Sequence, residues 1–414
     1  MSAETGRLEK PDPGPAAPVR VRGRHAGRRL RGAAARLRNA APALLGYTAV
    51  RVLGVLVVVV WGRHLDPTQP PLHRLATLWD AQWYQHIVRH GYVDKLAIGG
   101  YANGIPYSTL AFFPLYPWLI TAAHTVLPLS VPAAALAVSW GCSLLAAWGI
   151  FELGGRLHGR RAGVMAALLW GMLPGAVVES MAYSEPLFTA LAAWALLAVL
   201  LRQWLRAGTL SSLACLTRPT GIAVAAAIGV AVAGELLRMV RERRAHGWRR
   251  PVLGALLAPL GFLGYVAWVG ARRGRWDGYF QVQMAWNSHF DFGRSTADSF
   301  YRLLFSAQPV WLTEAVTALV LVAYLIQFGI CVVLRQPPWL LVYSAVLLLI
   351  ALGDAAYFNS RARFLLPAFP LLLPAAVGLT RIRRRATTML VLVSVSACSA
   401  VYGGYLTWVY PDAP

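Results

Sequence analysis

The segment 78–92 carries the side chains best suited to catalysis, in the order LWDAQWYQHIVRHGY. Gly91 predicts the end of a helix that begins near Asp80. On this helix Asp80, Trp83 and Tyr84 share one face, because side chains three and four residues apart are neighbours. A carboxylate beside aromatic rings can accept a proton from a sugar hydroxyl while a ring packs on the sugar. The other interpretation is an amphipathic interfacial helix with Asp80 as its N-cap.

Two further carboxylates, Glu179 and Glu185, lie just before another apolar run. Ser184 and Glu185 suit the first turn of a helix, where a hydroxyl caps backbone N–H groups and a negative charge complements the helix dipole. The alternative is that Glu185 is a second catalytic or metal-binding carboxylate, with Glu179 as a weaker candidate. No motif requires a cofactor, and a divalent metal is possible.

Three arginines occupy positions at which a purely structural role is hard to assign. Arg218 interrupts an apolar run, and a charge inside a membrane is costly and usually faces a cavity or a partner. Arg361 and Arg363 precede Phe364 at the end of another apolar run. Planar guanidinium groups are natural partners of phosphate. Arg361 and Arg363 fit either ordinary interfacial arginines or, together with Arg218, contacts to the phosphate of a lipid substrate.

Aromatic residues and histidines lie near these charges. Residues 111–117, AFFPLYP, form a rigid aromatic segment that suits packing or ligand binding, and the loop 276–293 is also aromatic. That loop fits either a cover over an acceptor site or an interfacial aromatic belt. His86 and His90 have the spacing of metal ligands, but no HExxH pattern or cysteine partner accompanies them. We interpret them as solvated or supporting side chains.

The composition requires a membrane protein. The chain has 414 residues, of which 57% are hydrophobic and 14% charged, and its mean hydropathy is +0.52. Soluble domains carry about a quarter charged residues, so a soluble enzyme is excluded. The net charge of +22 comes mostly from arginines at the ends of apolar runs, where they act as orientation signals rather than as a nucleic-acid surface. The four cysteines lack CxxC spacing and predict neither a disulfide framework nor a zinc site.

The apolar runs predict the elements that position these side chains. The runs lie at about 41–62, 110–128, 131–154, 162–178, 186–203, 209–238, 251–270, 311–334, 339–353, 364–380 and 386–408. Residues 1–40 are basic and rich in proline, which predicts a disordered cytoplasmic tail. Residues 41–408 then form a single transmembrane domain, with a first outer loop at 63–130 and a second at 271–310.

The basic connectors between runs predict the topology, because short loops rich in arginine stay on the cytoplasmic side. To keep them inside together with the N-terminus, we expect the run 110–128 to lie in the outer interface or to dip partway into the bilayer, with a full crossing as the alternative. The run 209–238 should cross twice or not at all, and a broken hairpin whose tip holds Arg218 in a protein-lined cavity fits this requirement. The outer face then collects the two outer loops with the segments 179–185 and 354–363.

Several motifs together resemble one known family. They are Trp79-Asp80-Ala81 with Tyr84, Ile87 and His90-Gly91-Tyr92, then Ala111-Phe112-Phe113-Pro114 with Tyr116-Pro117, Ala182-Tyr183-Ser184-Glu185, the Arg218–Gly221 turn, and Arg363-Phe364-Leu365. In order and spacing, over about residues 40–405, this pattern resembles the GPI mannosyltransferase II (PIG-V) type of membrane glycosyltransferase in the GT-C superfamily.

The resemblance implies an all-α, GT-C-like bundle of about 10–12 transmembrane helices with interfacial helices in the first outer loop. It implies an inverting transfer of mannose from a polyprenyl-phosphate-mannose donor to an acceptor hydroxyl, with Asp80 as general base and Glu185 supporting the acceptor or a metal. The expected substrate-binding residues are Trp79, Trp83, Tyr84, His86, Phe113, Tyr116 and Tyr183, together with Arg218, Arg361 and Arg363 from the charge argument.

The composition is rich in arginine and alanine and poor in lysine, which is typical of a high-GC bacterial protein. We therefore expect a bacterial plasma membrane, a cytoplasmic N-terminus, an outward active site, and a lipid or glycan acceptor. Membrane lipids are expected partners, and nucleic acid is not. Two other functions are open: a transporter or flippase for a lipid or solute, and a non-catalytic subunit that binds polyprenyl lipid.

Overall fold

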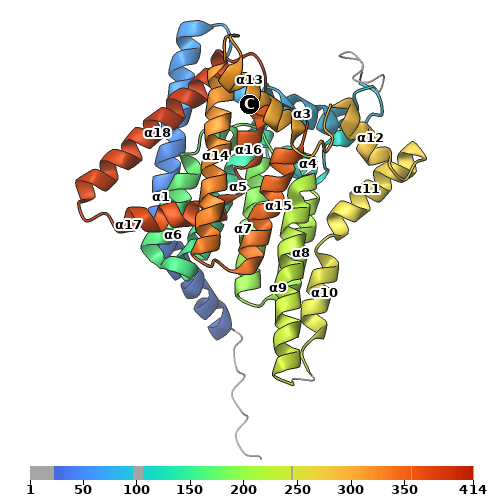
Figure 1. The fold of residues 1–414 in the computed structure, drawn as a ribbon, viewed down its shortest axis with the longest axis vertical. Coiled ribbons are helices and arrows are strands. Elements are labelled where there is room, and N and C mark those ends of the chain that lie inside the picture. The colour runs from blue at the N-terminus through green and yellow to red at the C-terminus, as the bar shows by residue number, and fades with distance from the viewer. Residues whose placement is uncertain (1–22, 97–105, 244–245, 356, 414) are drawn as a thin grey trace, which may run out of the picture. The chain divides into compact units, whose positions relative to one another are not determined.

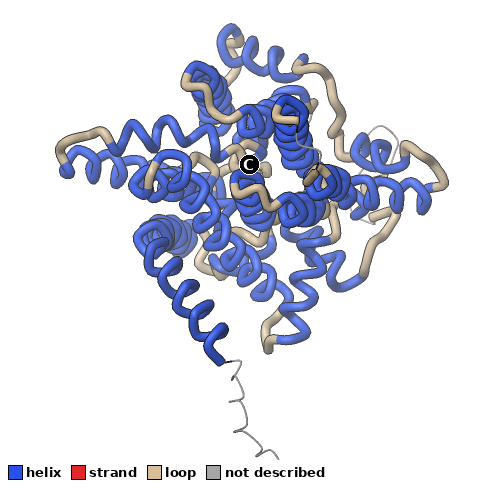
Figure 2. The backbone as a smooth tube through the Cα atoms, turned by 90° about the horizontal axis from the view of Figure 1, so that it is seen from below, coloured by secondary structure: helices blue, strands red, loops and turns tan. Residues whose placement is uncertain are grey.

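The computed structural model describes residues 23–96, 106–243, 246–355 and 357–413. Within these residues the backbone consists of helices and connecting loops, with one isolated β-bridge between Phe290 and Asp354 (Figure 2). The predicted all-α class is therefore confirmed. The chain divides into two units, residues 1–41 and residues 42–414.

The described α-helices and short 3₁₀ helices follow one another along the chain. They are α1 (Gly23–Leu65), α2 (Pro71–Thr77), α3 (Asp80–His90), η1 (Thr109–Ala111), α4 (Leu115–Val126), α5 (Val131–His158), α6 (Arg160–Gly171), η2 (Ala176–Ser180), α7 (Glu185–Leu200), α8 (Trp204–Cys215), η3 (Pro219–Gly221) and α9 (Ile222–Arg241). They continue with α10 (Arg249–Leu257), α11 (Leu260–Arg273), α12 (Gly278–Ala285), α13 (Arg294–Phe305), α14 (Leu312–Val333), α15 (Pro338–Gly353), η4 (Phe358–Ser360), α16 (Arg361–Phe364), η5 (Phe369–Leu372), α17 (Leu373–Thr380) and α18 (Arg385–Trp408).

Of the predicted tail 1–40, residues 1–22 lie outside the described residues. The remainder of that segment, from Gly23, forms the first part of α1. Pro42, at the boundary between the two units, lies inside the same helix.

Six helical stretches in the described residues are long and apolar enough to cross a membrane. They are Ala35–Leu65, Val131–His158, Pro219–Arg241, Arg249–Arg273, Leu312–Val333 and Arg385–Trp408. A bent pair, Phe358–Phe364 with Phe369–Thr380, makes a seventh if it counts as one span, and α7 and α15 are shorter apolar helices. The protein is therefore an integral membrane protein with several passes.

Two apolar runs form shorter helices than their composition suggests. The run 110–128 gives α4, whose 12 residues extend only about 18 Å, less than the roughly 30 Å of a bilayer core. The run 364–380 does not form one helix, because the chain bends by 76° between Phe364 and Phe369. Pro367 and Pro370 lie at this break and cannot supply the backbone N–H groups that a continuous helix needs.

The run 209–238 forms two helices joined by a turn, as predicted. Helix α8 ends at Cys215 and α9 begins at Ile222, so Arg218 lies in the connection. Glycines let α8 approach α10 and α11 closely. A Cβ on Gly208 would collide with the carbonyl of Gly254, and one on Gly261 would collide with the carbonyl of Ser212. This close packing fixes the position of the turn.

A buried cluster supports the segment 63–130. Leu75 of α2, Tyr84 of α3, Tyr116 of α4, Val178 of η2 and Tyr183 belong to this cluster, and all are nearly or fully enclosed. In Figure 1, α3 and α13 lie at the upper ends of α14 and α15. The short helices that carry the candidate residues are thus packed on the long ones rather than extended away from them.

Candidate functional site

Helix α3 holds Asp80 at its first residue and ends at Gly91, whose φ is 73°. The predicted helix and its polar-aromatic face are confirmed, with Tyr84 buried and Trp83 partly buried. The prediction that Asp80 is the N-cap is wrong, because Trp79 occupies the N-cap position. The Asp80 carboxylate instead accepts a hydrogen bond from Arg363, with Nη1 and Oδ2 2.9 Å apart.

Four charged side chains from four separate segments form one cluster. Arg363 Nη1 contacts Asp80, and Arg363 Nε lies 3.4 Å from Glu185 Oε1. The same Glu185 oxygen pairs with Nη1 of Arg218. The order of contacts is therefore Asp80, Arg363, Glu185, Arg218, with charges that alternate in sign and sum to zero. We call these four residues the charge cluster.

Burial differs sharply within the charge cluster. The side chains of Glu185 and Arg363 are 2% and 6% exposed, whereas those of Arg218 and Asp80 are 14% and 26% exposed. Buried charges are stable only when they are paired, so Glu185 and Arg363 depend on their neighbours in the cluster. Asp80 is the carboxylate that an incoming ligand can reach.

Aromatic rings hold the two arginines in place. The Arg363 guanidinium lies over the rings of Tyr183 and Phe364, at 5.2 Å and 5.1 Å from their centroids. Arg218 lies over the Phe364 ring as well, at 5.6 Å. The Tyr183 hydroxyl also accepts a hydrogen bond from the backbone N–H of Asp80, at 3.2 Å. Tyr183 therefore contacts both ends of the Asp80–Arg363 pair.

The residue before Asp80 has an unusual backbone. Trp79 has a φ of 50° and a ψ of −119°, a conformation that side chains other than glycine rarely adopt. Such a conformation costs roughly 1–3 kcal/mol and persists only where surrounding contacts impose it. The contacts of Asp80 with Tyr183 and Arg363 supply such a constraint, so the strain is concentrated beside the exposed carboxylate.

Three predicted ligand-contacting residues are enclosed by protein. Phe113, Tyr116 and Tyr183 are 1%, 0% and 0% exposed. The Phe113 ring packs on Tyr265, and the Tyr116 hydroxyl donates to the carbonyl of Ala135. These side chains pack within the protein here, and their contact with substrate stays a prediction.

Ser184 and Tyr84 interact in a way that the sequence did not indicate. Ser184 occupies the N-cap position of α7, as predicted, but it makes no side-chain capping bond. Its Oγ lies 2.8 Å from the hydroxyl of Tyr84, which links α7 to α3. The contact with Ser184 therefore holds the Tyr84 side chain, which is 5% exposed, close to Glu185.

Arg361 does not join the charge cluster. It is fully buried, and its Nη2 donates to Ser295 Oγ at 2.7 Å and to the carbonyl of Asp354 at 2.6 Å. Its guanidinium lies over the Phe358 ring. Arg361 thus connects α13 and the loop after α15 to α16, and its contact with a lipid phosphate stays a prediction.

The predicted aromatic loop lies against α3. Trp286 packs edge-on against Trp83, with 5.5 Å between ring centroids, and it also contacts Tyr107 and Phe112. Its indole N–H donates to the carbonyl of Ser108. Trp286 of this loop therefore packs against the helix that carries Asp80, and both interpretations of the loop stay predictions.

His86 and His90 have ring centroids 4.8 Å apart on α3. Partial burial and the neighbouring His90 both lower the pKa of His86, so its imidazole is neutral at neutral pH. Among the described residues, no group of three or more His, Cys, Asp or Glu side chains is arranged to hold a metal ion.

Comparison with known proteins gives a partial likeness in fold. No family model matches the sequence, and no curated protein matches it. ArnT from Cupriavidus metallidurans, solved bound to undecaprenyl phosphate, aligns with 85% of this chain at 17% identity and a TM-score of 0.49. The oligosaccharyltransferase AglB from Archaeoglobus fulgidus, solved with an inhibitory peptide and a dolichol-phosphate, aligns with 87% at 14% identity and a TM-score of 0.45. The alignments cover 64% and 55% of those longer chains, and they assign no residue role here.

Proposed function

We propose that this protein is a membrane glycosyltransferase of the GT-C type, which moves a sugar from a polyprenyl-phosphate-linked donor to an acceptor hydroxyl. The charge cluster carries the proposal, because it places the reachable carboxylate of Asp80 beside the Arg363 guanidinium and joins Arg218 to that pair through Glu185. The motif resemblance supports the GT-C assignment and favours mannose as the sugar. A lipid or glycan serves as the acceptor.

The reaction requires a carboxylate that acts as a base and, close to it, a positively charged group that binds the phosphate. The acceptor oxygen attacks the anomeric carbon of the donor sugar and forms the new glycosidic bond while the bond from that carbon to the phosphate oxygen breaks. The acceptor proton passes to a carboxylate, and the polyprenyl phosphate leaves with the bonding electron pair. A base lowers the barrier to attack by the acceptor oxygen, and fixed positive charge stabilises the leaving phosphate.

Asp80 is the base in this proposal, and its exposure is the reason. Arg363 contacts its Oδ2 atom, so we assign proton acceptance to Oδ1. Glu185 has no comparable access, because its side chain is 2% exposed and both of its oxygens are enclosed. We therefore assign Glu185 a positioning role: it holds the guanidinium groups of Arg218 and Arg363 in one place before the donor arrives.

Arg218 and Arg363 bind the donor phosphate in this proposal. A guanidinium has five N–H donors, so an arginine that contacts one carboxylate oxygen can donate to a phosphate as well. Arg218 is the more accessible of the two and approaches from the turn between α8 and α9, whereas Arg363 lies between Asp80 and Glu185. The phosphate therefore meets Arg218 first, and Arg363 links the phosphate site to the base.

The proposed setting is a bacterial plasma membrane, with the N-terminus cytoplasmic and the charge cluster on the outer side. The short basic connectors support this orientation through the distribution of their arginines. The prenyl chain of the donor then lies among the membrane-spanning helices while the sugar lies above them.

Sugar transfer by the purified protein in liposomes tests the proposal. The substrates are labelled polyprenyl-phosphate-mannose and a membrane lipid extract. We expect Asp80→Asn to lower the transfer rate by about 10²–10⁴-fold, the usual contribution of a general base, and to leave donor binding intact. The matched control is Asp94→Asn, since Asp94 is an exposed loop carboxylate that pairs with Arg272.

The result separates the proposal from its rivals. Donor binding without transfer by either the wild-type protein or Asp80→Asn supports a non-catalytic lipid-binding subunit. Absence of donor binding and of transfer favours a transporter of another solute. Full transfer by Asp80→Asn contradicts the role of Asp80 as base.

A further inference from the structure

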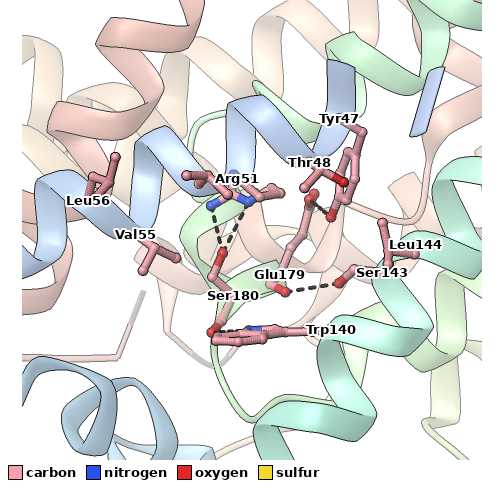
Figure 3. A pocket seen from close by; sticks show the side chains of 11 residues that line it. Tyr47, Thr48, Arg51, Val55, Leu56, Trp140, Ser143, Leu144, Glu179 and Ser180 are labelled. Carbon is pink, nitrogen blue, oxygen red and sulfur yellow. Dashed lines mark hydrogen bonds between the residues drawn. The ribbon is translucent and has the colours of Figure 1, made fainter. Parts of the chain in front are cut away.

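A cavity lies between α1 and α5, apart from the charge cluster (Figure 3). Its volume is about 270 Å³. One wall is a single face of α1 from Tyr47 to Leu56, the opposite wall is the Trp140–Leu144 part of α5, and Glu179 and Ser180 of η2 complete the lining. We call this cavity the α1–α5 groove.

The walls of the groove suit a hydrocarbon chain. Val52, Leu56, Trp140 and Leu144 line it, and their side chains are about half exposed. Both wall helices belong to the stretches long and apolar enough to cross a membrane. In a bilayer such exposed apolar side chains face lipid, so an acyl or prenyl chain can enter the groove without crossing water.

The polar end of the groove contains one buried oxygen atom without a hydrogen-bond partner. Glu179 is 1% exposed, and its Oε2 accepts a hydrogen bond from the hydroxyl of Tyr47 at 2.8 Å. Its Oε1 is buried without a hydrogen-bond partner. An enclosed polar atom without a hydrogen-bond partner destabilises the protein, so a molecule that fills the groove should bring a hydrogen-bond donor to Oε1.

The neighbouring arginine is already occupied. Arg51 donates to Ser180 Oγ from Nε and Nη2, at 3.1 Å and 3.0 Å, and to the carbonyl of Gly171 from Nη1, at 2.8 Å. Figure 3 shows this guanidinium directed at Ser180, with Glu179 between it and Tyr47. Each of the three nitrogens makes one of these hydrogen bonds, and the polar atom of the groove without a partner is Glu179 Oε1. A lipid hydroxyl can form a hydrogen bond with it.

We propose that the α1–α5 groove binds a membrane lipid with a neutral, hydroxyl-bearing head group, whose hydroxyl donates to Glu179 Oε1 while its chain lies along Val52, Leu56 and Leu144. This site goes beyond the proposed glycosyl transfer. The two sites would contact a ligand differently. The charge cluster offers guanidinium N–H donors, whereas the groove offers one carboxyl oxygen without a hydrogen-bond partner.

Photolabelling of the full-length protein in phosphatidylcholine vesicles tests the site. The probe is 1-oleoylglycerol with a diazirine in its chain, and mass spectrometry locates the labelled peptides. We expect labels within residues 47–56 and 140–144. Unlabelled 1-oleoylglycerol should compete about tenfold better than methyl oleate, which has no hydroxyl donor, because one additional buried hydrogen bond favours binding by up to about this factor.

Two sets of variants separate a specific site from a hydrocarbon-filled gap. Val52→Trp fills the groove and should abolish labelling, whereas Val393→Trp, at an exposed position on α18, should not. Tyr47→Phe leaves Oε1 in place and should keep the preference for the hydroxyl lipid. The double variant Tyr47→Phe/Glu179→Leu removes the acceptor without stranding a tyrosine hydroxyl, and it should lose the preference.

Three results would overturn the proposal. Equal competition by methyl oleate would show that the head group makes no hydrogen bond. Stronger competition by 1-oleoyl lysophosphatidic acid would show an anion site. Labelling that is absent from these two segments, or that persists in Val52→Trp, would show that the lipid lies elsewhere.

Discussion

The charge cluster makes a prediction about stability that tests whether its four residues act as a unit. Arg363 Nε and Glu185 Oε1 are 3.4 Å apart, which corresponds to a Coulomb attraction of about 5 kcal/mol at an effective dielectric constant near 20. Removing one partner of a buried ion pair costs roughly 3–5 kcal/mol, because the other charge stays buried without compensation. We expect Glu185→Gln to lower the free energy of unfolding by about that amount.

The double variant gives the sharper result. Glu185→Gln leaves one anion and two cations in the cluster, and Arg218→Gln leaves two anions and one cation. The double variant restores neutrality, since Asp80 and Arg363 remain paired. If the two changes were additive, the double variant would lose roughly 6–10 kcal/mol. We expect it to recover at least about 2–3 kcal/mol of the additive loss.

Unfolding of the purified protein in mixed micelles, followed by tryptophan fluorescence, measures these differences. The matched control is the pair Arg238 and Glu242, which is 49% and 39% exposed. Exposed pairs of this kind contribute less than about 1 kcal/mol, so the same double-mutant cycle there should show almost no coupling. Strict additivity at Glu185 and Arg218 would refute the view that these charges form one compensated network.

Three other predictions follow from single features. Arg363→Lys keeps the charge but cannot reach Asp80 and Glu185 together, so kcat/KM for transfer should fall about 10²-fold, and an unchanged value would contradict the bridging role. Gly261→Ala should destabilise the protein by about 1–3 kcal/mol through collision with Ser212 on α8, whereas Gly264→Ala, which meets open space, should not; equal unfolding free energies would argue against the close packing. His86→Gln should leave the pH–rate profile between pH 6.5 and 8 unchanged, because the lowered pKa of His86 keeps its imidazole mostly neutral there. Protonation of His86, with any loss of stability that it causes, then occurs at lower pH. A shifted profile would show that His86 titrates between pH 6.5 and 8.

Local elements could be predicted because their signals are local. The apolar run that starts at residue 131 gives α5 from Val131, and Gly91 ends α3 as its freedom at positive φ suggests. The turn at Arg218 follows from a proline and a glycine inside an apolar run. Each of these features depends on residues within one or two helical turns.

The partners in the charge cluster could not be predicted in the same way. Asp80 and Arg363 are 283 residues apart, and no periodicity connects them. Arg361 and Arg363 looked equivalent in the sequence, but residues two apart on a helix point about 200° away from each other, so only one of them can face Asp80. Ser184 was predicted as a cap from its local position, and a tertiary contact with Tyr84 replaced the capping bond.

The charge cluster also has a consequence for biogenesis, because its members are synthesised at very different times. Glu185 and Arg218 lie only 33 positions apart, so they can neutralise each other as soon as α7, α8 and the following turn have entered the membrane. Asp80 has no such early partner in the cluster, since Arg363 follows near the end of the chain. The Asp80–Arg363 end of the cluster is therefore completed last, after most of the helices have been synthesised.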